Sequence, residues 1–166
     1  MTARVALRGV VESDLPIFFE HQHDPPSVAM AAFPARERAA HTAHWTKIMA
    51  DHSTTLRTIL SDGNVVAGNI VSWEGSDGRE VGYWVGREFW GRGIATRALE
   101  LFLDQVQIRP LVAHVARHNV ASRRVLEKCG FVVTGAAGVL PEPAGEPVAE
   151  FIFRLDHRLP VRHDTE

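Results

Sequence analysis

A glycine-rich run near the middle of the chain has the residue types and spacing of an anion-binding turn. It reads Phe89-Trp90-Gly91-Arg92-Gly93-Ile94-Ala95-Thr96. Glycine takes backbone dihedrals that other residues avoid and carries no side chain to block a ligand, so the amides at the start of a following helix can point outward together. The positive end of the helix dipole and the charge of Arg92 would favour a phosphate there. The predicted anion site comprises Gly91, Arg92, Gly93, Ile94, Ala95 and Thr96.

Two common nucleotide-binding motifs do not fit this run. A P-loop ends in Gly-Lys followed by Ser or Thr, and the chain contains no such sequence. The dinucleotide fingerprint requires a small residue where Thr96 stands, and a carboxylate about 20 residues further on at the end of a second parallel strand. Glu127 lies instead in a helix pattern. The run therefore favours a phosphate-bearing ligand of another kind.

The residues that flank the run predict the strand and the helix that would hold it. From Glu80 to Val85 the side chains alternate, which places Glu80, Gly82 and Trp84 on one face of a strand. After the run, apolar residues recur at intervals of three and four, at Ala95, Ala98, Leu99, Phe102, Leu103 and Val106. The run is therefore predicted to join a strand to an amphipathic helix.

This arrangement resembles the pyrophosphate loop of the GNAT superfamily of N-acetyltransferases. The family pattern is Gln or Arg, two residues, Gly, one residue, then Gly or Ala, and Gly93 and Ala95 match it. Trp90 stands where Gln or Arg is usual. This departure resembles the subgroup of ribosomal-protein alanine acetyltransferases, in which Tyr-Trp-Gly-Lys-Gly-Ile-like runs are usual.

A second motif follows in the order and at the separation that this family shows. It contains Asn119, Ser122 and a terminal Gly130-Phe131, and it resembles the second coenzyme A motif, an Asn-x-x-Ser helix that ends in Gly-Phe. Asn119 is also a good N-cap and Gly130 stands where a left-handed C-cap belongs, so helix formation alone can explain both residues. On the two motifs together, the chain is identified as a member of the superfamily.

The resemblance implies an acetyl-CoA-dependent N-acetyltransferase, with acetyl-CoA as co-substrate. In this family coenzyme A lies between two diverging central strands, here those of Tyr83 and Leu111, and an amine attacks the thioester directly without a covalent enzyme intermediate. The Val85 amide would hydrogen-bond the thioester oxygen. The implied cofactor-binding residues are Trp84, Val85 and Gly86 along the pantetheine arm, the anion site from Gly91 to Thr96, and Asn119 and Ser122.

The attacking amine must be neutral, whereas an alkyl ammonium has a pKa near ~10.4, so a base or a chain of waters is expected. Glu80 is the first candidate for a catalytic base, because it lies on the strand expected to border the cleft. A solvated strand-edge glutamate is the alternative interpretation of this residue. Glu142, Glu146 and Glu150 are rival candidates.

The departing thiolate needs a proton. Many family members use a Tyr in the second motif, but the only tyrosine here, Tyr83, lies elsewhere in the sequence. In the alanine-acetyltransferase subgroup the Ser of Asn-x-x-Ser lies near the sulfur, so the resemblance assigns this catalytic role to Ser122. A hydroxyl that bonds its own helix backbone or the N-cap is the alternative.

Composition argues against several other function classes. The chain has 166 residues, is 45% hydrophobic, and carries a formal net charge of −2 from 18 basic and 20 acidic residues, which does not favour a nucleic-acid partner. No His-Glu-x-x-His spacing or cysteine pair occurs, so no metal is expected. His41 and His44 are expected to be exposed, His114 to be a pocket or core histidine, and Cys129 to be a buried, inert thiol.

The chain start and the hydropathy pattern bear on localisation. The first residues lead straight into a strand pattern rather than an apolar signal core, and no run approaches ~18 apolar residues. We therefore expect a cytoplasmic protein without a membrane partner.

The order of the predicted elements indicates an α/β fold. We expect a mixed, mostly antiparallel central sheet of six or seven strands flanked by about four helices, with a splayed parallel pair that binds coenzyme A. Strands are predicted over residues 5–8, 54–60, 65–73, 80–85, 111–116, 131–133 and 148–155. The segment Asp24-Pro25-Pro26-Ser27 is predicted to end the first helix, a second helix is predicted over 36–51, and 135–147 to form a surface loop. Residues 1–156 are expected to form a single N-acetyltransferase domain, and 157–166 a polar tail.

The acceptor is expected to be a primary amine, on a small molecule or a protein N-terminus. In the superfamily the first two helices and the late loop shape the acceptor site, which here implicates residues 18–33 and 135–147. Dimers are frequent in the superfamily, so a homodimer is one assembly that the resemblance suggests. An acyl-CoA-binding sensor or partner module without efficient turnover is the main alternative, and a nucleotide-binding protein, testable by competition between ATP and acetyl-CoA, is a third.

Overall fold

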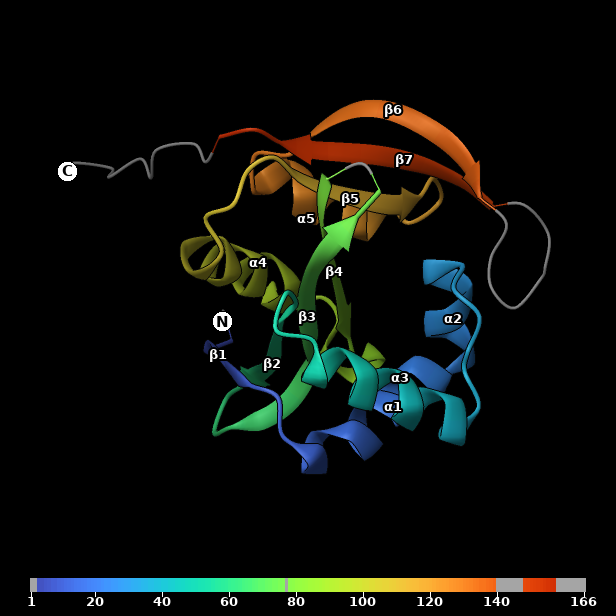
Figure 1. The fold of residues 1–166 in the computed structure, drawn as a ribbon, viewed down its shortest axis with the longest axis vertical. Helices are drawn as coiled ribbons and strands as arrows, with labels where there is room; N and C mark the ends of the chain where they lie inside the picture. The colour runs from blue at the N-terminus through green and yellow to red at the C-terminus, as the bar shows by residue number, and fades with distance from the viewer. Residues whose placement is uncertain (1–2, 77, 140–147, 158–166) are drawn as a thin grey trace.

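The computed structural model describes residues 3–76, 78–139 and 148–157, which form a seven-stranded sheet with helices on both faces (Figure 1). In chain order the elements are β1 (Val5–Gly9), α1 (Leu15–His23), α2 (Pro25–Ala31), α3 (Arg38–Ala50), β2 (Thr55–Ser61), β3 (Val65–Gly75), β4 (Gly78–Val85), α4 (Ile94–Gln105), β5 (Leu111–Ala116), α5 (Val120–Lys128), β6 (Val132–Val139) and β7 (Val148–Leu155). The predicted α/β class and strand number are confirmed. The described residues contain five α-helices, one more than the sequence indicated.

The sheet has the strand order β1-β2-β3-β4-β5-β7-β6, and every neighbouring pair is antiparallel except β4 and β5. These two parallel strands pair only at Arg79 with Leu111 and at Glu80 with Val112. Beyond that point β4 continues to Val85 and β5 to Ala116 without pairing to each other. The predicted splayed pair is therefore present, and β5, β7 and β6 turn away from the first four strands (Figure 1).

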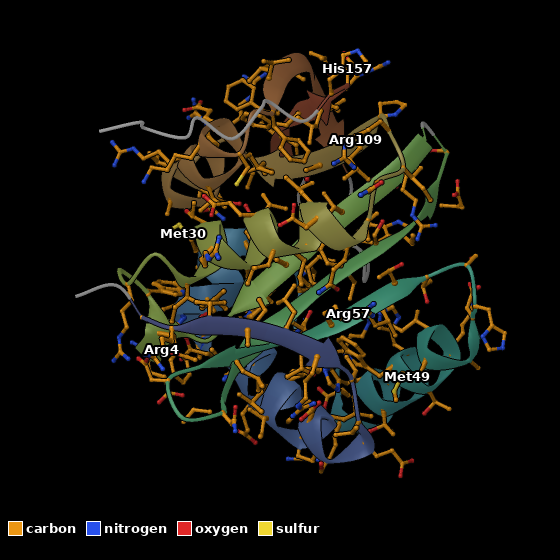
Figure 2. All side chains as sticks on the ribbon, turned by 90° about the vertical axis from the view of Figure 1, so that its left-hand side faces the viewer. Arg4, Met30, Met49, Arg57, Arg109 and His157 are labelled. Atoms are coloured by element: carbon orange, nitrogen blue, oxygen red, sulfur yellow. The ribbon has the colours of Figure 1, made fainter. Side chains whose placement is uncertain are left out.

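Two apolar cores hold the helices against the sheet. Successive strand residues point to opposite faces, so Ile70 packs in the core under α4 and α5, while Val71 packs in the core under α1 and α3. The aromatic centres of the two cores are Phe102 on α4 and Trp45 on α3. Polar contacts add to this packing near the end of α4, where Arg57 of β2 donates to Gln105 at 2.8 Å (Figure 2).

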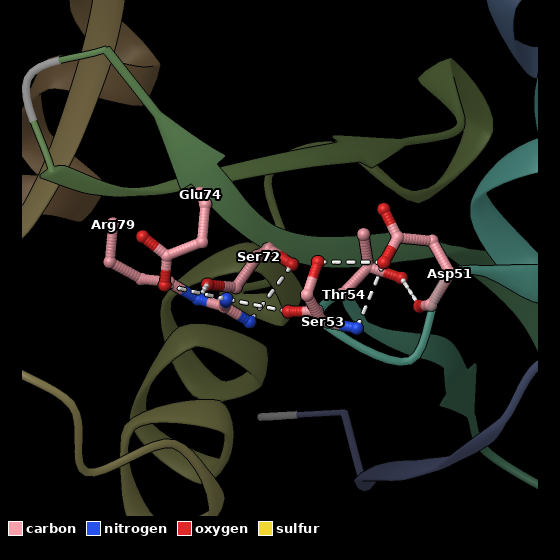
Figure 3. Close-up of polar contacts among 6 residues, drawn as sticks. All are labelled: Asp51, Ser53, Thr54, Ser72, Glu74 and Arg79. Carbon is pink, nitrogen blue, oxygen red and sulfur yellow. Dashed lines mark hydrogen bonds and ion pairs between the residues drawn. The ribbon is translucent and has the colours of Figure 1, made fainter.

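A buried arginine fixes the start of β4 (Figure 3). Arg79 is 6% exposed, and its guanidinium donates to the Ser72 hydroxyl at 2.8 Å and to the Ser53 carbonyl at 2.6 Å. It also pairs with Glu74 at 3.2 Å. Ser53 is in turn held by Asp51, whose carboxylate accepts from the Ser53 amide and hydroxyl. A buried charge is stable only when its hydrogen-bond donors have partners. The network therefore holds Arg79, the residue before Glu80, in one position.

Two segments differ from the sequence-based expectation. The predicted break at Asp24-Pro25-Pro26-Ser27 does end α1, but it also begins α2, because Asp24 Oδ2 accepts from the Ser27 amide at 3.2 Å and the Ser27 hydroxyl at 2.8 Å. The expected loop over 135–147 was wrong at its start, since β6 runs on to Val139 in pairing with β7. The remainder, 140–147, lies outside the described residues, and so do the rival bases Glu142 and Glu146.

The helices, the cysteine and the end of the chain bear on three further expectations. Within the described part of the chain, no helix is both long and apolar enough to span a membrane. Burial raises the pKa of Cys129 to about 12, which agrees with an inert thiol. The division into a domain over 1–156 and a tail over 157–166 stays a prediction, and 158–166 lie outside the described residues.

Candidate active site

A cleft of about 490 Å³ lies at the open end of the splayed pair, between β4 and the helices α4 and α5. Most of the predicted cofactor-binding residues line it: Trp84, Val85, Gly91, Gly93, Ile94, Ala95, Thr96, Asn119 and Ser122. Gly86 and Arg92 do not line it. Gly86 is buried against the His21 ring, and the Arg92 guanidinium lies 5.8 Å from the centre of the Phe89 ring.

The glycine turn presents an open helix terminus to this cleft. Gly91 and Gly93 have φ values of 76° and 72°, in the left-handed region that favours glycine, and α4 begins at the next residue, Ile94. A Cβ atom at either glycine would meet nothing within 4 Å, so the space in front of the turn is free. Ile94 is 2% exposed and anchors the helix start in the core. The turn therefore has the geometry for an anion that the sequence predicted.

Backbone groups of β4 face the gap between the diverging strands. The Gly86 amide donates to the Ala67 carbonyl of β3 at 2.8 Å, and Val85 is the register partner of Gly68. Because backbone groups alternate in direction along an antiparallel pair, the amide and carbonyl of Val85 point away from β3. Pairing with β5 has already ended at Glu80, so the Val85 groups point into the cleft.

Trp90 binds one of these backbone groups. Its indole nitrogen donates to the Val85 carbonyl at 3.0 Å, and the side chain is 42% exposed at the edge of the cleft. The departure of Trp90 from the family pattern therefore has a physical role in this structure. Trp90 fixes the end of β4, because the carbonyl that it binds belongs to Val85, whose amide remains directed at the cleft.

The second motif brings a tyrosine and a serine together. Asn119 caps α5 by accepting from the Ser122 amide at 3.2 Å, and the Ser122 hydroxyl lies 2.8 Å from the Tyr83 hydroxyl. Burial raises the pKa of Tyr83 well above its ordinary value, so the phenol keeps its proton. Tyr83 is remote from the second motif in the sequence but adjacent to it in space, because β4 and α5 meet across the cleft.

Two basic residues on the cleft wall escaped the sequence interpretation. Arg124 and Lys128 lie one turn apart on α5, on the side that also carries Ala121 and Val125, and all four line the cleft. The sequence contained a signal for this wall, because residues spaced by three and four, such as Ala121, Arg124 and Lys128, lie on one helix face. Their charges make this wall favourable for phosphate groups.

Helix α2 covers the mouth of the cleft from the other side. Ser27, Met30 and Ala31 contribute to the lining, and Figure 2 labels Met30. The His118 ring contacts the Ala29 carbonyl at 2.9 Å, which ties α2 to the loop after β5. The Trp84 indole donates to the carbonyl of His21 at 3.1 Å, which ties the end of α1 to β4.

A row of three titratable side chains crosses the opposite face of the sheet at the point where β4 and β5 part. Glu80 Oε1 lies 3.2 Å from His114 Nε2, and His114 Nδ1 lies 3.9 Å from Glu150 Oε1. Burial raises the pKa of Glu150, an effect that His114 opposes and the charge of Glu80 reinforces. We refer to Glu80, His114 and Glu150 as the carboxylate–histidine row.

Two histidines lie in other positions than the sequence indicated. His114 is not a core histidine, because its side chain is 28% exposed on the sheet surface beside Glu80, and it is not among the residues that line the cleft. His41 was expected to be exposed, yet it is 2% exposed and packs edge-on to Phe19. Within residues 3–76, 78–139 and 148–157, no cluster of three or more His, Cys, Asp or Glu side chains is arranged to hold a metal ion.

Comparison with known proteins gives one family. The family model described as the acetyltransferase (GNAT) domain matches residues 4–132. The "Putative ribosomal N-acetyltransferase YdaF" of Bacillus subtilis is 29% identical over 101 residues, which are 56% of this chain and 54% of that protein. The chain therefore spans about half the length of this curated relative.

Solved structures share the fold at low sequence identity. A spermidine N-acetyltransferase from Vibrio cholerae, in complex with CoA and spermine, superimposes with a TM-score of 0.78 at 17% identity, over 92% of this chain and 95% of that one. A GNAT-family acetyltransferase from Bacillus anthracis gives a TM-score of 0.75 at 19% identity, over 94% and 96%. RimL, a ribosomal L7/L12 alpha-N-protein acetyltransferase in complex with coenzyme A, gives 0.75 at 18%, over 92% and 93%. Since the family model covers most of the described residues, the chain belongs to the GNAT acetyltransferase family, with a resemblance to its ribosomal-protein subgroup.

Proposed function

We propose that the protein transfers an acetyl group from acetyl-CoA to a primary amine, on a small molecule or a protein N-terminus, by direct attack in a ternary complex. The observation that carries this proposal is the cleft at the open end of β4 and β5, with a glycine turn and the α4 terminus on one side and Arg124 and Lys128 on the other. An elongated, phosphate-bearing thioester fits such a cleft.

The two ends of the cleft would bind different parts of the cofactor. The amides of the predicted anion site, Gly91 to Thr96, would bind the pyrophosphate, with the positive end of α4 favouring its charge. The pantetheine arm would run past Trp84 and Val85 at the end of β4, where the Val85 backbone faces the cleft, and Asn119 and Ser122 would line its other side. The predicted contact with Gly86 is not part of this placement, because its amide binds the Ala67 carbonyl. The support for this placement is that the described residues leave both the turn and the β4 backbone open to the cleft.

The reaction divides between the two faces of the sheet. Glu80 would accept a proton from the acceptor ammonium through a chain of waters, because five residues of extended strand, about 16 Å, separate it from Val85. The neutral amine would then attack the thioester carbonyl carbon, with the Val85 amide donating to the carbonyl oxygen. As the carbon–sulfur bond breaks, the sulfur would take a proton from Ser122, and the second proton that the attacking nitrogen loses as the amide forms would return to the Ser122 oxygen. With Tyr83 as the donor in the 2.8 Å contact, the Ser122 hydrogen is free to point at the sulfur.

The first experiment is a calorimetric titration with acetyl-CoA of the wild type, Gly93→Asp and Gly63→Asp. Both glycines have a left-handed φ, 72° and 73°, and neither has an atom within 4 Å of an added Cβ. The two substitutions therefore impose matched backbone strain and charge, but only Gly93 borders the cleft. We expect binding to be lost in Gly93→Asp alone. Equal affinity in all three proteins would refute the placement of the pyrophosphate.

A second experiment separates an enzyme from an acyl-CoA-binding module. Thiol release from acetyl-CoA is measured with an amine panel of spermidine, free amino acids and a peptide that begins with alanine. Removal of a general base typically costs about 10²- to 10⁴-fold in rate, so Glu80→Gln should lose turnover on the best acceptor while its acetyl-CoA affinity stays at the wild-type value. Tight acetyl-CoA binding without turnover on any amine of the panel would favour the sensor.

A further inference from the structure

The carboxylate–histidine row carries an inference that rests on the proposed function and goes beyond it. The row draws one side chain from each of three adjacent strands, β4, β5 and β7, and its members share one sheet face. Each imidazole nitrogen faces a different carboxylate, Nε2 toward Glu80 at 3.2 Å and Nδ1 toward Glu150 at 3.9 Å. Imidazole accepts a proton at one nitrogen and donates at the other, so the ring can pass a proton between the two carboxylates. The 3.9 Å between Nδ1 and Glu150 exceeds a direct hydrogen bond, so a water would bridge that gap.

We infer that His114 is a positioning and relay residue that acts through Glu80, returning Glu80 to its ionised form by conducting the amine proton to Glu150. Glu80, protonated by the acceptor ammonium, donates that proton to His114 Nε2. The proton on Nδ1 leaves through a bridging water to the Glu150 carboxylate and from there to solvent. Each step breaks one bond to hydrogen and forms another, so Glu80 ends ionised and His114 ends neutral with its proton on Nε2. Exchange with water at the 28%-exposed ring then returns the proton to Nδ1 and closes the cycle.

The environment of each member suits its part. The side chains of Glu80 and Glu150 are each 19% exposed, whereas that of His114 is 28% exposed. Water can therefore reach the row, although its side chains are mostly shielded from solvent. The remaining charged side chain on this part of β7, Arg154, is paired with Asp156. Gly75 leaves the space that the Glu80 carboxylate occupies, because a Cβ there would lie 1.9 Å from Oε2.

The kinetic test compares His114→Ala, His114→Gln and the control His52→Ala on the best acceptor of the amine panel. We expect both His114 variants to lose roughly 10²-fold in kcat, with the KM for acetyl-CoA within about twofold of the wild type. Added imidazole should restore part of the rate of His114→Ala only. A glutamine can hydrogen-bond Glu80 but cannot carry a proton through its side chain, so wild-type activity of His114→Gln would overturn the relay.

A spectroscopic arm needs no acceptor and so separates failure of the relay from failure of the proposed function. Nitrogen chemical shifts of the His114 ring are recorded in the wild type, Glu80→Gln and Glu150→Gln, with the His52 ring as an internal control. We expect Glu80→Gln to move mainly the Nε2 signal and Glu150→Gln mainly the Nδ1 signal. If Glu150→Gln leaves both His114 signals unchanged, the proton route to Glu150 is refuted, whatever the outcome of the amine panel.

Discussion

A glycine on β3 gives a way to move the proposed base without removing any chemical group. A Cβ atom at Gly75 would lie 1.9 Å from Glu80 Oε2 and 2.6 Å from Glu80 Cδ. Ordinary van der Waals contact begins near 3.4 Å, so in Gly75→Ala the Glu80 carboxylate must shift by about 1.5 Å. The shift costs little stability, because the atoms that yield are the end of a flexible side chain. Misplacing a reacting group by about 1 Å can cost on the order of 10²-fold in rate.

We therefore expect Gly75→Ala to lose about 10- to 10²-fold in kcat on the best acceptor, with a melting temperature within a few degrees of the wild type. Gly9→Ala is the matched control, since a Cβ there meets nothing within 4 Å. If the effect passes through Glu80, adding Gly75→Ala to Glu80→Gln should change the rate no further. A wild-type rate in Gly75→Ala would refute the idea that the position of this carboxylate matters.

Three further outcomes are expected from the same structure. In Gly68→Ala the new Cβ would lie 2.0 Å from the Trp84 carbonyl oxygen, a backbone atom that cannot yield easily. The melting temperature should therefore fall by about 3–10 °C, whereas Gly9→Ala should not change it. Trp90→Phe removes the indole donor to the Val85 carbonyl, and calorimetry should show acetyl-CoA affinity weakened by roughly fivefold, with unchanged affinity contradicting the role of this bond. Burial, with nearby Arg36, His44 and Arg38, lowers the pKa of His41 from 6.5 to about 4. The unfolded chain therefore takes up this proton first as the pH falls, and urea titrations between those two pH values should show the unfolding free energy drop by up to about 3 kcal/mol, a drop that His41→Leu reduces.

The glycine turn before α4 and the cap of α5 were predictable because their signals are local in sequence. The glycine turn and α4 lie within one continuous stretch, and the left-handed φ of Gly93 follows from the residue type. Asn119 likewise caps α5 through an amide only three residues away, at Ser122. Where the residues that form a feature are neighbours in the chain, pattern and spacing were sufficient to find it.

The contacts across the sheet were not predictable from spacing. Tyr83 and Ser122 are 39 residues apart, and their hydroxyls meet only because α5 packs over β4. His114 lies in a segment with the alternating pattern of a strand, but whether its side chain is exposed depends on which face of the sheet the helices cover. Strand order decides that Glu150 on β7, rather than a residue of another strand, is its neighbour. Such pairs follow from topology, which a single sequence does not reveal.

The errors in element boundaries have two causes. Asp24-Pro25-Pro26-Ser27 has the composition of a break, yet Asp24 is also a helix cap and Pro25 suits the first helical position, so one short segment both ends α1 and begins α2. This signal is local and was overlooked. Small residues at Gly135, Ala136 and Ala137 resemble a loop, but pairing with β7 makes them part of β6, so there tertiary pairing overrides weak local preference.

The fork between β4 and β5 explains how groups on opposite faces of one sheet can serve one reaction. In a closed sheet the backbone ladder separates the two faces, so Tyr83 and Glu80, which point to opposite sides of β4, could not act on a common group. Here the ladder stops at the pairing of Glu80 with Val112, and the cleft continues beyond it. In the proposed reaction, a thioester held along β4 on the side of α4 and α5 would meet an amine that enters through this gap, and a chain of waters would carry the amine proton to Glu80. Arg79, clamped by Ser53 and Ser72, fixes the place where the ladder ends, and with it the meeting point of the two faces.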